Sequence, residues 1–139
     1  MKKELQEQLF SKYPKLFAQK DLSMSQTSMC FGICCGDGWK DLIDRLCQVI
    51  TALDPEGLVQ AVQVKEKFGM LRFYVGRASL PIFDAIDLAE RASAVTCEEC
   101  GLVLSSIRYD LPWYRTLCDE HYEETLAKMK KSGRKPRKL

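Results

Sequence analysis

The chain has 139 residues, of which 46% are apolar, and a formal net charge of +2. This length is sufficient for one domain with a hydrophobic core, with or without an appendage. No run of about 18 apolar residues occurs, and the N-terminus lacks the apolar middle of a signal peptide. We therefore expect a cytoplasmic protein without a membrane partner, in which the seven cysteines are reduced.

The first forty residues predict short helices and an irregular, glycine-rich segment. Residues 2–12 place Leu5 and Leu9 on one helical face, and Pro14 begins another turn. Residues 20–27 are polar and rich in serine, which predicts a loop. Residues 29–39 contain three glycines and three cysteines, so this backbone allows positive φ or the close approach of another group.

The middle of the chain predicts a helix, a hairpin and a second helix. Asp37 is the expected N-cap of a helix from about Trp39 to Leu53, and the sequence Asp54-Pro55 ends it. Its core-facing residues are Leu42, Leu46, Val49, Ile50 and Leu53. Strands over 57–65 and 71–75 are joined by the connector 66–69. The next helix begins near Ser79 and Pro81 and ends near Ala94, with one face formed by Ile82, Phe83, Ile86, Ala89 and Ser93.

Two cysteine-containing pairs near the C-terminus predict a zinc site. Cys97 and Cys100 form a C-x-x-C pair, and Cys118 and His121 repeat the spacing after seventeen intervening residues. A two-residue gap lets a tight turn direct both ligand atoms at one point. Two such pairs complete the tetrahedral shell of one structural Zn²⁺. The alternative is a chance spacing of reduced thiols and a surface histidine.

The segment around these ligands predicts a treble-clef-like zinc finger. Strands over 103–107 and 114–117 would form a hairpin with its turn at 110–112, and a helix would run from Asp119 to about Lys131. The order of knuckle, hairpin and ligand-bearing helix is that of a treble clef. The complete chain is therefore expected to be α+β, with helices packed on a small antiparallel sheet. Residues 1–127 would form one compact domain that includes the finger at 97–127.

Residues 128–139 form a basic segment that we expect to be a disordered tail. It contains no acid and seven basic residues, which leaves residues 1–127 with 14 basic and 19 acidic residues. The tail could neutralise phosphates and bind nucleic acid, or it could be a solvated terminus that aids solubility. It has no interleaved aromatic residue, which favours the second reading. The candidate nucleic-acid-binding residues are Lys130, Lys131, Arg134, Lys135, Arg137 and Lys138, preceded by Lys128.

The sequence offers no obvious catalytic site. His121 is the only histidine, so if it binds zinc no imidazole remains to act as a general base. The motifs of zinc deaminases, phosphate-binding loops and serine hydrolases are not found. A catalytic zinc keeps a coordination position open for water, whereas this ligand set is complete. We therefore expect a protein that is not an enzyme.

The cysteines outside the finger have three interpretations. Cys30, Cys34 and Cys35, with Cys47 in the following helix, could hold a second metal ion, although their spacing is unlike that of known sites. They could instead be small buried apolar residues near a glycine turn. A reactive thiol at the helix N-terminus is the third interpretation.

An exposed surface near the hairpin is the candidate interaction site. Arg72 and Tyr74 should face away from the inward set Leu71, Phe73 and Val75. An arginine and a tyrosine on one sheet face suit recognition of a protein or nucleotide, although an ordinary solvated face is the alternative. The full candidate set is Asp37, Trp39, Glu66, Lys67, Arg72, Tyr74 and Arg77.

Three segments give the chain a resemblance to a known group of proteins. They are CGDGW at 35–39, VKEKFGMLRFYVG at 64–76, and CEEC at 97–100 together with WYRTLCDEH at 113–121. On these segments the chain resembles a family of small uncharacterised proteins encoded by phages and prophages. The resemblance implies life inside a bacterial host cell. We expect an accessory protein that binds a host protein, for example in counter-defence, with nucleic-acid binding and nucleotide or small-molecule binding as alternatives.

Overall fold

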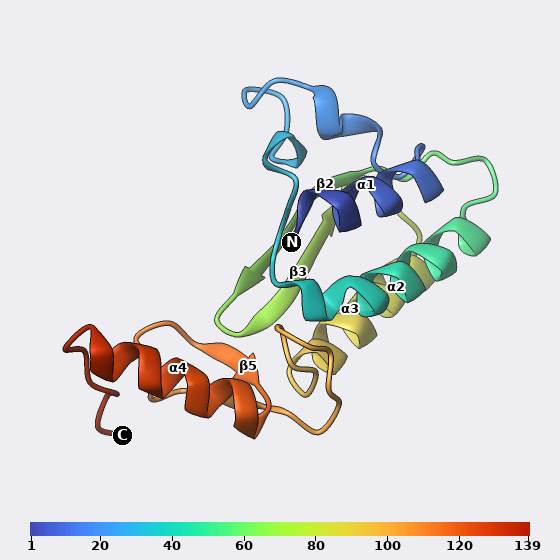
Figure 1. Ribbon diagram of the computed structural model, residues 1–139. Coiled ribbons are helices and arrows are strands. Elements are labelled where there is room, and N and C mark those ends of the chain that lie inside the picture. Colours follow the sequence, from blue (N-terminus) through green and yellow to red (C-terminus); the bar gives the residue numbers. More distant parts are fainter.

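The computed structural model describes residues 1–139 and confirms the α+β class (Figure 1). Figure 1 shows a body built from the first three helices and a sheet, with α4 and a second, smaller sheet forming a lobe beside it. None of the helices combines the length and apolar character needed to cross a membrane. The elements are α1 (Lys3–Lys12), η1 (Ala18–Asp21), η2 (Met29–Phe31), β1 (Ile33–Cys34), η3 (Asp37–Trp39), α2 (Lys40–Leu53), β2 (Ala61–Lys67), β3 (Met70–Val75), α3 (Leu80–Ser93), β4 (Ser106–Arg108), β5 (Arg115–Leu117) and α4 (Asp119–Lys131).

The sheet of the body is mixed instead of purely antiparallel. β2 and β3 form the expected antiparallel hairpin, while β1 adds a parallel strand in which Ile33 pairs with Val64. Strand β1 has only two residues, too few to show the alternation of apolar and polar side chains that identifies a strand. The sequence therefore predicted only an irregular segment there. The connection between β2 and β3 is also tighter than expected. Phe68 and Gly69 alone form the turn, both with positive φ, which is the type I′ geometry.

A single large core lies between the helices and the sheet of the body. It contains 21 buried residues, and Trp39, Phe17 and Phe73 are its largest fully buried side chains. Helix α3 also covers the outer edge of β3. The Leu71 N–H donates to Ser93 Oγ at 2.8 Å, and the Phe73 N–H donates to Glu90 Oε1 at 3.1 Å. These side chains satisfy backbone donors that would otherwise be left free at the sheet edge.

Three residues predicted to face the core are exposed instead. On α2 the buried residues are Leu42, Ile43, Leu46, Cys47 and Ile50, so the buried face is centred one residue away from the expected one. Val49 and Leu53 therefore lie at the margin and are each 45% exposed. On α3 the prediction is confirmed for four residues of the five, and Phe83 is 44% exposed. In both helices the apolar sequence pattern is wider than the surface that the sheet and neighbouring helix can cover.

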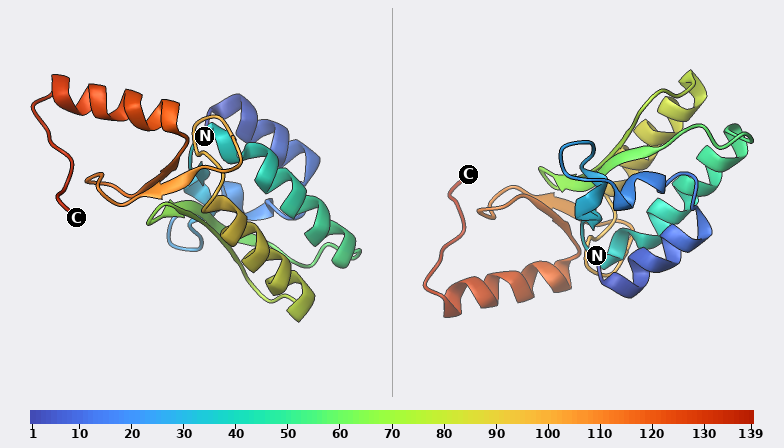
Figure 2. Two further views of the ribbon diagram at one scale, coloured as in Figure 1. Left: turned by 90° about the horizontal axis from the view of Figure 1, so that it is seen from below. Right: turned by 90° about the horizontal axis from the view of Figure 1, so that it is seen from above.

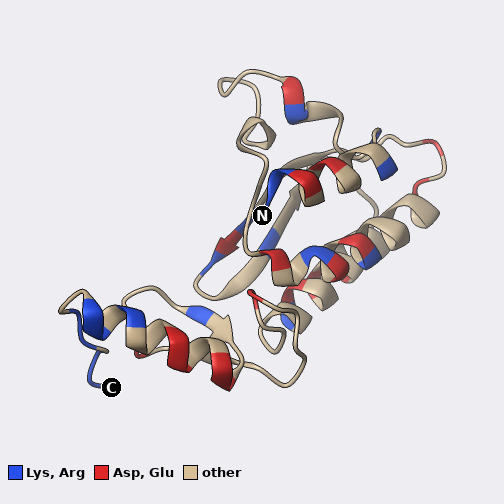
Figure 3. Cartoon of the chain, viewed as in Figure 1, with Lys and Arg blue, Asp and Glu red and all other residues tan.

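The C-terminal part, here called the finger (residues 97–131), has its own small core. This core consists of Cys97, Leu111, Leu117, Cys118 and Met129. The two views in Figure 2 show α4 projecting away from the body, so the finger meets the body through its knuckle and its hairpin. Acidic residues occupy the first turn of α4 and basic residues its last turn, an arrangement that complements the helix dipole (Figure 3).

The boundary of the basic tail differs from the expected one. Helix α4 continues to Lys131, so Lys128, Lys130 and Lys131 belong to a regular helix. Residues 134–139 have no helix or strand. The charges of the predicted tail are thus divided between the end of a helix and an extended segment of the chain.

Candidate metal centre

The four predicted ligands lie together and could bind one metal ion. One ligand atom from each of Cys97, Cys100, Cys118 and His121 lies within 4.8 Å of all the others. A tetrahedral ion of the size of zinc would separate two sulfurs by about 3.8 Å, and a sulfur and a nitrogen by about 3.6 Å. The Sγ atoms of Cys100 and Cys118 are 3.9 Å apart, and Cys97 Sγ is 3.6 Å from His121 Nδ1. Cys118 Sγ lies closer to His121 Nδ1, at 3.1 Å. The four donor atoms are therefore gathered around one point, where they could hold a single four-coordinate ion.

Local backbone structure positions each pair of ligands. In the knuckle, the Gly101 N–H donates to Cys97 O at 2.8 Å, and Gly101 adopts a φ of +79°. A residue with a Cβ would be strained there. Cys118 is the N-cap residue of α4, and His121 lies in the first turn of that helix. The Thr125 hydroxyl donates to His121 O at 2.7 Å, and this bond holds the ligand-bearing turn.

The two knuckle thiols have different acidities. Burial raises the pKa of Cys97, but backbone N–H groups of Cys118, Cys100 and Glu99 stabilise its thiolate, and the pKa falls to about 7. Burial and the neighbouring Cys97 raise the pKa of Cys100 to about 11. Metal binding requires deprotonated thiols. Cys97 is thus the thiol that is more readily ionised in the metal-free protein.

The knuckle is locked against the glycine-rich segment of the body. The Gly38 N–H donates to Glu98 O at 2.8 Å, and the Gly36 N–H donates to Glu98 Oε1 at 3.0 Å. A Cβ on Gly38 would lie 2.6 Å from Gly101 N and 2.7 Å from Cys100 N, far inside contact distance. The glycines of residues 29–39 were expected to let another group approach the backbone closely, and that group is the knuckle.

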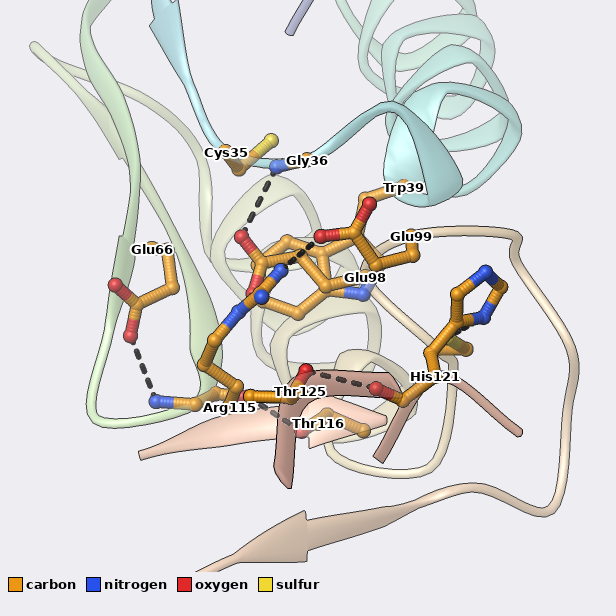
Figure 4. Close-up of polar contacts among 12 residues, drawn as sticks. Cys35, Gly36, Trp39, Glu66, Glu98, Glu99, Arg115, Thr116, His121 and Thr125 are labelled. Carbon is orange, nitrogen blue, oxygen red and sulfur yellow. Dashed lines mark hydrogen bonds and ion pairs between the residues drawn. The ribbon is translucent and has the colours of Figure 1, made fainter. Parts of the chain in front are cut away.

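Glu98 and Arg115 connect the knuckle with β5 of the finger (Figure 4). The Glu98 carboxylate is buried, and its Oε2 lies 3.5 Å from Arg115 Nε. Arg115 also pairs with Glu99. Burial raises the pKa of Glu98, and the nearby Arg115 and the Gly36 N–H oppose that rise. The carboxylate consequently joins the body, the knuckle and the finger hairpin at one point.

The β4–β5 hairpin of the finger also contacts the body at the turn between β2 and β3. The Thr116 hydroxyl donates to Gly69 O at 2.6 Å, and the Gly69 N–H donates to Glu66 Oε1 at 2.8 Å (Figure 4). Both Thr116 and its partner are buried. The finger is therefore held to the body at two separate places.

The predicted interaction surface is not assembled as one site. Trp39 is completely buried, and its indole N–H donates to Thr96 O at 2.8 Å, so it cannot contact a partner. Asp37 accepts the Lys2 backbone N–H at 2.8 Å, and makes no N-cap hydrogen bond to the following helix. Arg72 lies 3.7 Å from Glu90, whereas Tyr74 is 40% exposed. Arg77 is exposed, and Glu66 and Lys67 lie at the β2–β3 tip.

The cysteines outside the finger do not form a second metal cluster. The one group of three or more metal-ligating side chains is the C-terminal one. Cys35 and Cys47 are buried, and this burial raises the pKa of both, that of Cys35 to about 12. Cys34 is exposed, and its thiol donates to Phe31 O at 3.3 Å. The two buried cysteines correspond to the interpretation as small apolar core residues.

Sequence reasoning missed the central role of Glu98 and Arg115. Both are ordinary charged residues in the sequence, and each acquires its role only when separate segments meet. The one available signal was the spacing of Gly36 and Gly38, which indicated that some group approaches the backbone closely.

Replacing Gly38 with alanine should destabilise the protein by about 1–3 kcal/mol, because the added Cβ would force the knuckle away from the body. Chemical denaturation of both proteins measures this change. Gly76→Ala is the matched control, since nothing lies within 4 Å of its Cβ position, and it should change stability by less than about 0.5 kcal/mol. Equal effects of the two substitutions would contradict the locked knuckle.

Metal analysis should find about one ion per chain, and Cys118→Ser should lower the free energy of unfolding by about 4 kcal/mol or more. Occupancy at a fixed chelator concentration should fall as the pH is lowered, because protons compete for the thiolates. Cys34→Ser replaces an exposed non-ligand and should change neither quantity. A stable protein that retains no metal would refute the site.

Comparison with known proteins adds no family to these findings: no family model, curated protein or solved structure matches the chain.

Proposed function

We propose that this protein is a non-enzymatic accessory protein of phage or prophage type, which holds one structural Zn²⁺ and acts in the bacterial cytoplasm by binding a host protein. The closed ligand set supports the structural role of the metal, because three thiols and one imidazole leave no coordination position for water. Zinc is favoured over other ions by this soft, tetrahedral donor set. The chain's only histidine is then engaged by the metal.

The observation that carries the proposal is a set of exposed apolar residues that flank the knuckle on both sides and are joined by backbone pairing. These residues, Val95, Leu102, Val103 and Leu104, are called the knuckle-loop patch. Leu104 is 93% exposed, and the other three are between 45% and 58% exposed. A contiguous apolar patch of this kind is typical of a protein–protein contact site. The patch contains no charged side chain, which fits an apolar surface of a protein partner.

Hydrogen bonds across the loop hold the backbone of the knuckle-loop patch in place. Leu102 O accepts both the Cys97 N–H at 2.9 Å and the Ser105 hydroxyl at 2.7 Å, and the Ser105 N–H donates to Val95 O at 2.9 Å. A bridge between Thr96 and Val103 closes the loop. Preorganisation of this kind reduces the entropy lost on binding.

Leu104 has an unfavourable backbone conformation at the turn that the hydrogen bonds of Ser105 close. Its φ is +73°, a region that costs an ordinary residue about 1–2 kcal/mol. Strain of this kind is often retained at binding sites. An apolar side chain that is almost fully exposed and held in this conformation supports a role in binding a partner.

Leu104→Asn tests the proposal without adding strain, because asparagine tolerates positive φ better than leucine. The variant should fold at least as stably as the wild type and lose the host protein that the wild type retains from bacterial lysate. With the purified partner, affinity should fall by roughly 10- to 100-fold, the loss expected for one buried leucine.

The matched control is Leu88→Asn, which removes a 66% exposed leucine from α3, away from the patch. This variant should retain the partner with unchanged affinity. Loss of the partner in both variants, or in neither, would contradict a binding site at the knuckle-loop patch.

A further inference from the structure

Four aromatic side chains gather where the tips of the two hairpins meet. Phe68 lies in the β2–β3 turn, and Tyr109, Trp113 and Tyr114 lie in the loop between β4 and β5. The ring centroids of Phe68 and Tyr114 are 6.5 Å apart, and those of Tyr109 and Tyr114 are 5.4 Å apart. Trp113 is 74% exposed and Phe68 is 66% exposed. These four residues, with Lys67 and Arg137, are called the hairpin-tip surface.

The C-terminal segment folds back and places a cation among these rings. The Arg137 N–H donates to Asp110 O at 2.6 Å, and its guanidinium donates to Pro112 O at 2.8 Å. The same guanidinium lies 5.7 Å from the centroid of Tyr114, and Lys67 Nζ lies 5.6 Å from that of Phe68. The aromatic residues that the tail lacks in sequence are therefore supplied by the hairpins.

A cavity of about 380 Å³ opens on this surface. Its lining consists of Glu66, Lys67, Phe68, Pro112, Trp113, Tyr114 and Arg137. The one carboxylate of the lining, Glu66, already accepts the Gly69 N–H. The nearby Asp110 carboxylate accepts the hydroxyl of Tyr122. The site thus combines aromatic faces and cations, while its nearest carboxylates are engaged by internal donors.

Further positive charge lies at the same end of the molecule. Figure 3 shows the basic end of α4 and the tail on the side of the β4–β5 loop, and Figure 2 shows the C-terminus close to that loop. The additional residues are Lys128, Lys130, Lys131, Arg134, Lys135 and Lys138. A chain-like ligand whose aromatic rings stack in the cavity, and which extends beyond it toward the C-terminal segment, would lie next to these cations.

We propose that the hairpin-tip surface binds single-stranded nucleic acid, with bases stacked on Trp113 and its neighbouring rings and phosphates held by Arg137 and the other basic residues. Stacking on aromatic side chains combined with a cationic path is the general means of sequence-tolerant single-strand binding. A duplex hides the base faces, so it would use only the charges. A protein occupant is less well matched, because the basic residues beside the cavity outnumber the carboxylates there, and lysine is depleted in protein–protein interfaces. This activity goes beyond the host-protein binding at the knuckle-loop patch and does not depend on it.

Trp113 gives a direct readout of stacking. The chain has two tryptophans, and because Trp39 is completely buried, quenching by an added oligonucleotide reports on Trp113. Titration with an oligo(dT) and an oligo(U) of about 12 nucleotides should quench the fluorescence, while a duplex of equal length should quench it much less. Absence of quenching and of salt-sensitive binding by fluorescence anisotropy would overturn the proposal.

Two substitutions separate stacking from charge. Trp113→Ala should weaken binding of both oligonucleotides by roughly 5- to 100-fold at constant salt, whereas the control Leu88→Ala should change it by less than about twofold. Replacing Arg134, Lys135, Arg137 and Lys138 with glutamine should make the slope of log K against log salt shallower by up to about 3, because each lost phosphate contact contributes about 0.7. Unchanged metal content and thermal unfolding would show that both variants fold.

A protein partner at the hairpin-tip surface is the competing outcome. It would be shown by a lysate protein that the wild type and Leu88→Ala retain but Trp113→Ala loses, together with no oligonucleotide binding by the wild type. That result would overturn the nucleic-acid proposal while leaving the knuckle-loop patch untouched. Conversely, loss of host-protein binding in Leu104→Asn without an effect on oligonucleotides would show that the two surfaces act separately.

Discussion

The backbone contact between the glycine-rich segment and the metal-binding knuckle is the constraint on which this structure depends. No side chain fits at Gly38, whose N–H is bonded to Glu98 O. The next residue, Trp39, is the largest side chain of the core and donates to Thr96 O, just before the first ligand. Core packing and metal binding are therefore joined through adjacent residues, and neither is complete without the other.

The sequence predicted best those features whose physics is local. The two-residue gaps of Cys97 and Cys100, and of Cys118 and His121, are local signals that each turn two ligands toward one point, and the structure brings the two pairs together. The first three helices and the β2–β3 hairpin follow from apolar periodicity, whereas α4 was expected from the order of the ligand pairs. Strand β1 was missed because two residues carry no period, and its place is set by pairing with a strand far along the chain. The exposed Val49 and Leu53 show a second limit, since periodicity does not reveal how much of an apolar face the neighbours cover.

Features that arise from distant segments could not be predicted from local pattern. Trp39 was placed in the candidate interaction surface, yet the core encloses it. The basic tail lacked aromatic neighbours in sequence, whereas in space Arg137 lies over Tyr114. Glu98 gains its importance from Gly36 and Arg115, which belong to other segments. In each case the contact that determines the role of the residue joins separate segments of the sequence.

The proposed metal ion would act by fixing the geometry of the finger. Three of the four residues of the knuckle-loop patch follow Cys100 and Gly101 directly, and Val95 precedes Cys97, so the knuckle sets the position of the patch. The hairpin-tip surface is formed by the β2–β3 turn and the β4–β5 loop. Thr116 of β5 is bonded to Gly69 of that turn and also, through its carbonyl, to the Glu98 N–H of the knuckle. A rigid ligand set is needed to keep both surfaces in place, because the finger's own core has only five buried residues. A finger that lacked the proposed ion would keep its local helix and turn but lose the fixed relation between these two surfaces. A structural role of that ion is therefore sufficient to explain why four possible ligands are concentrated at this point.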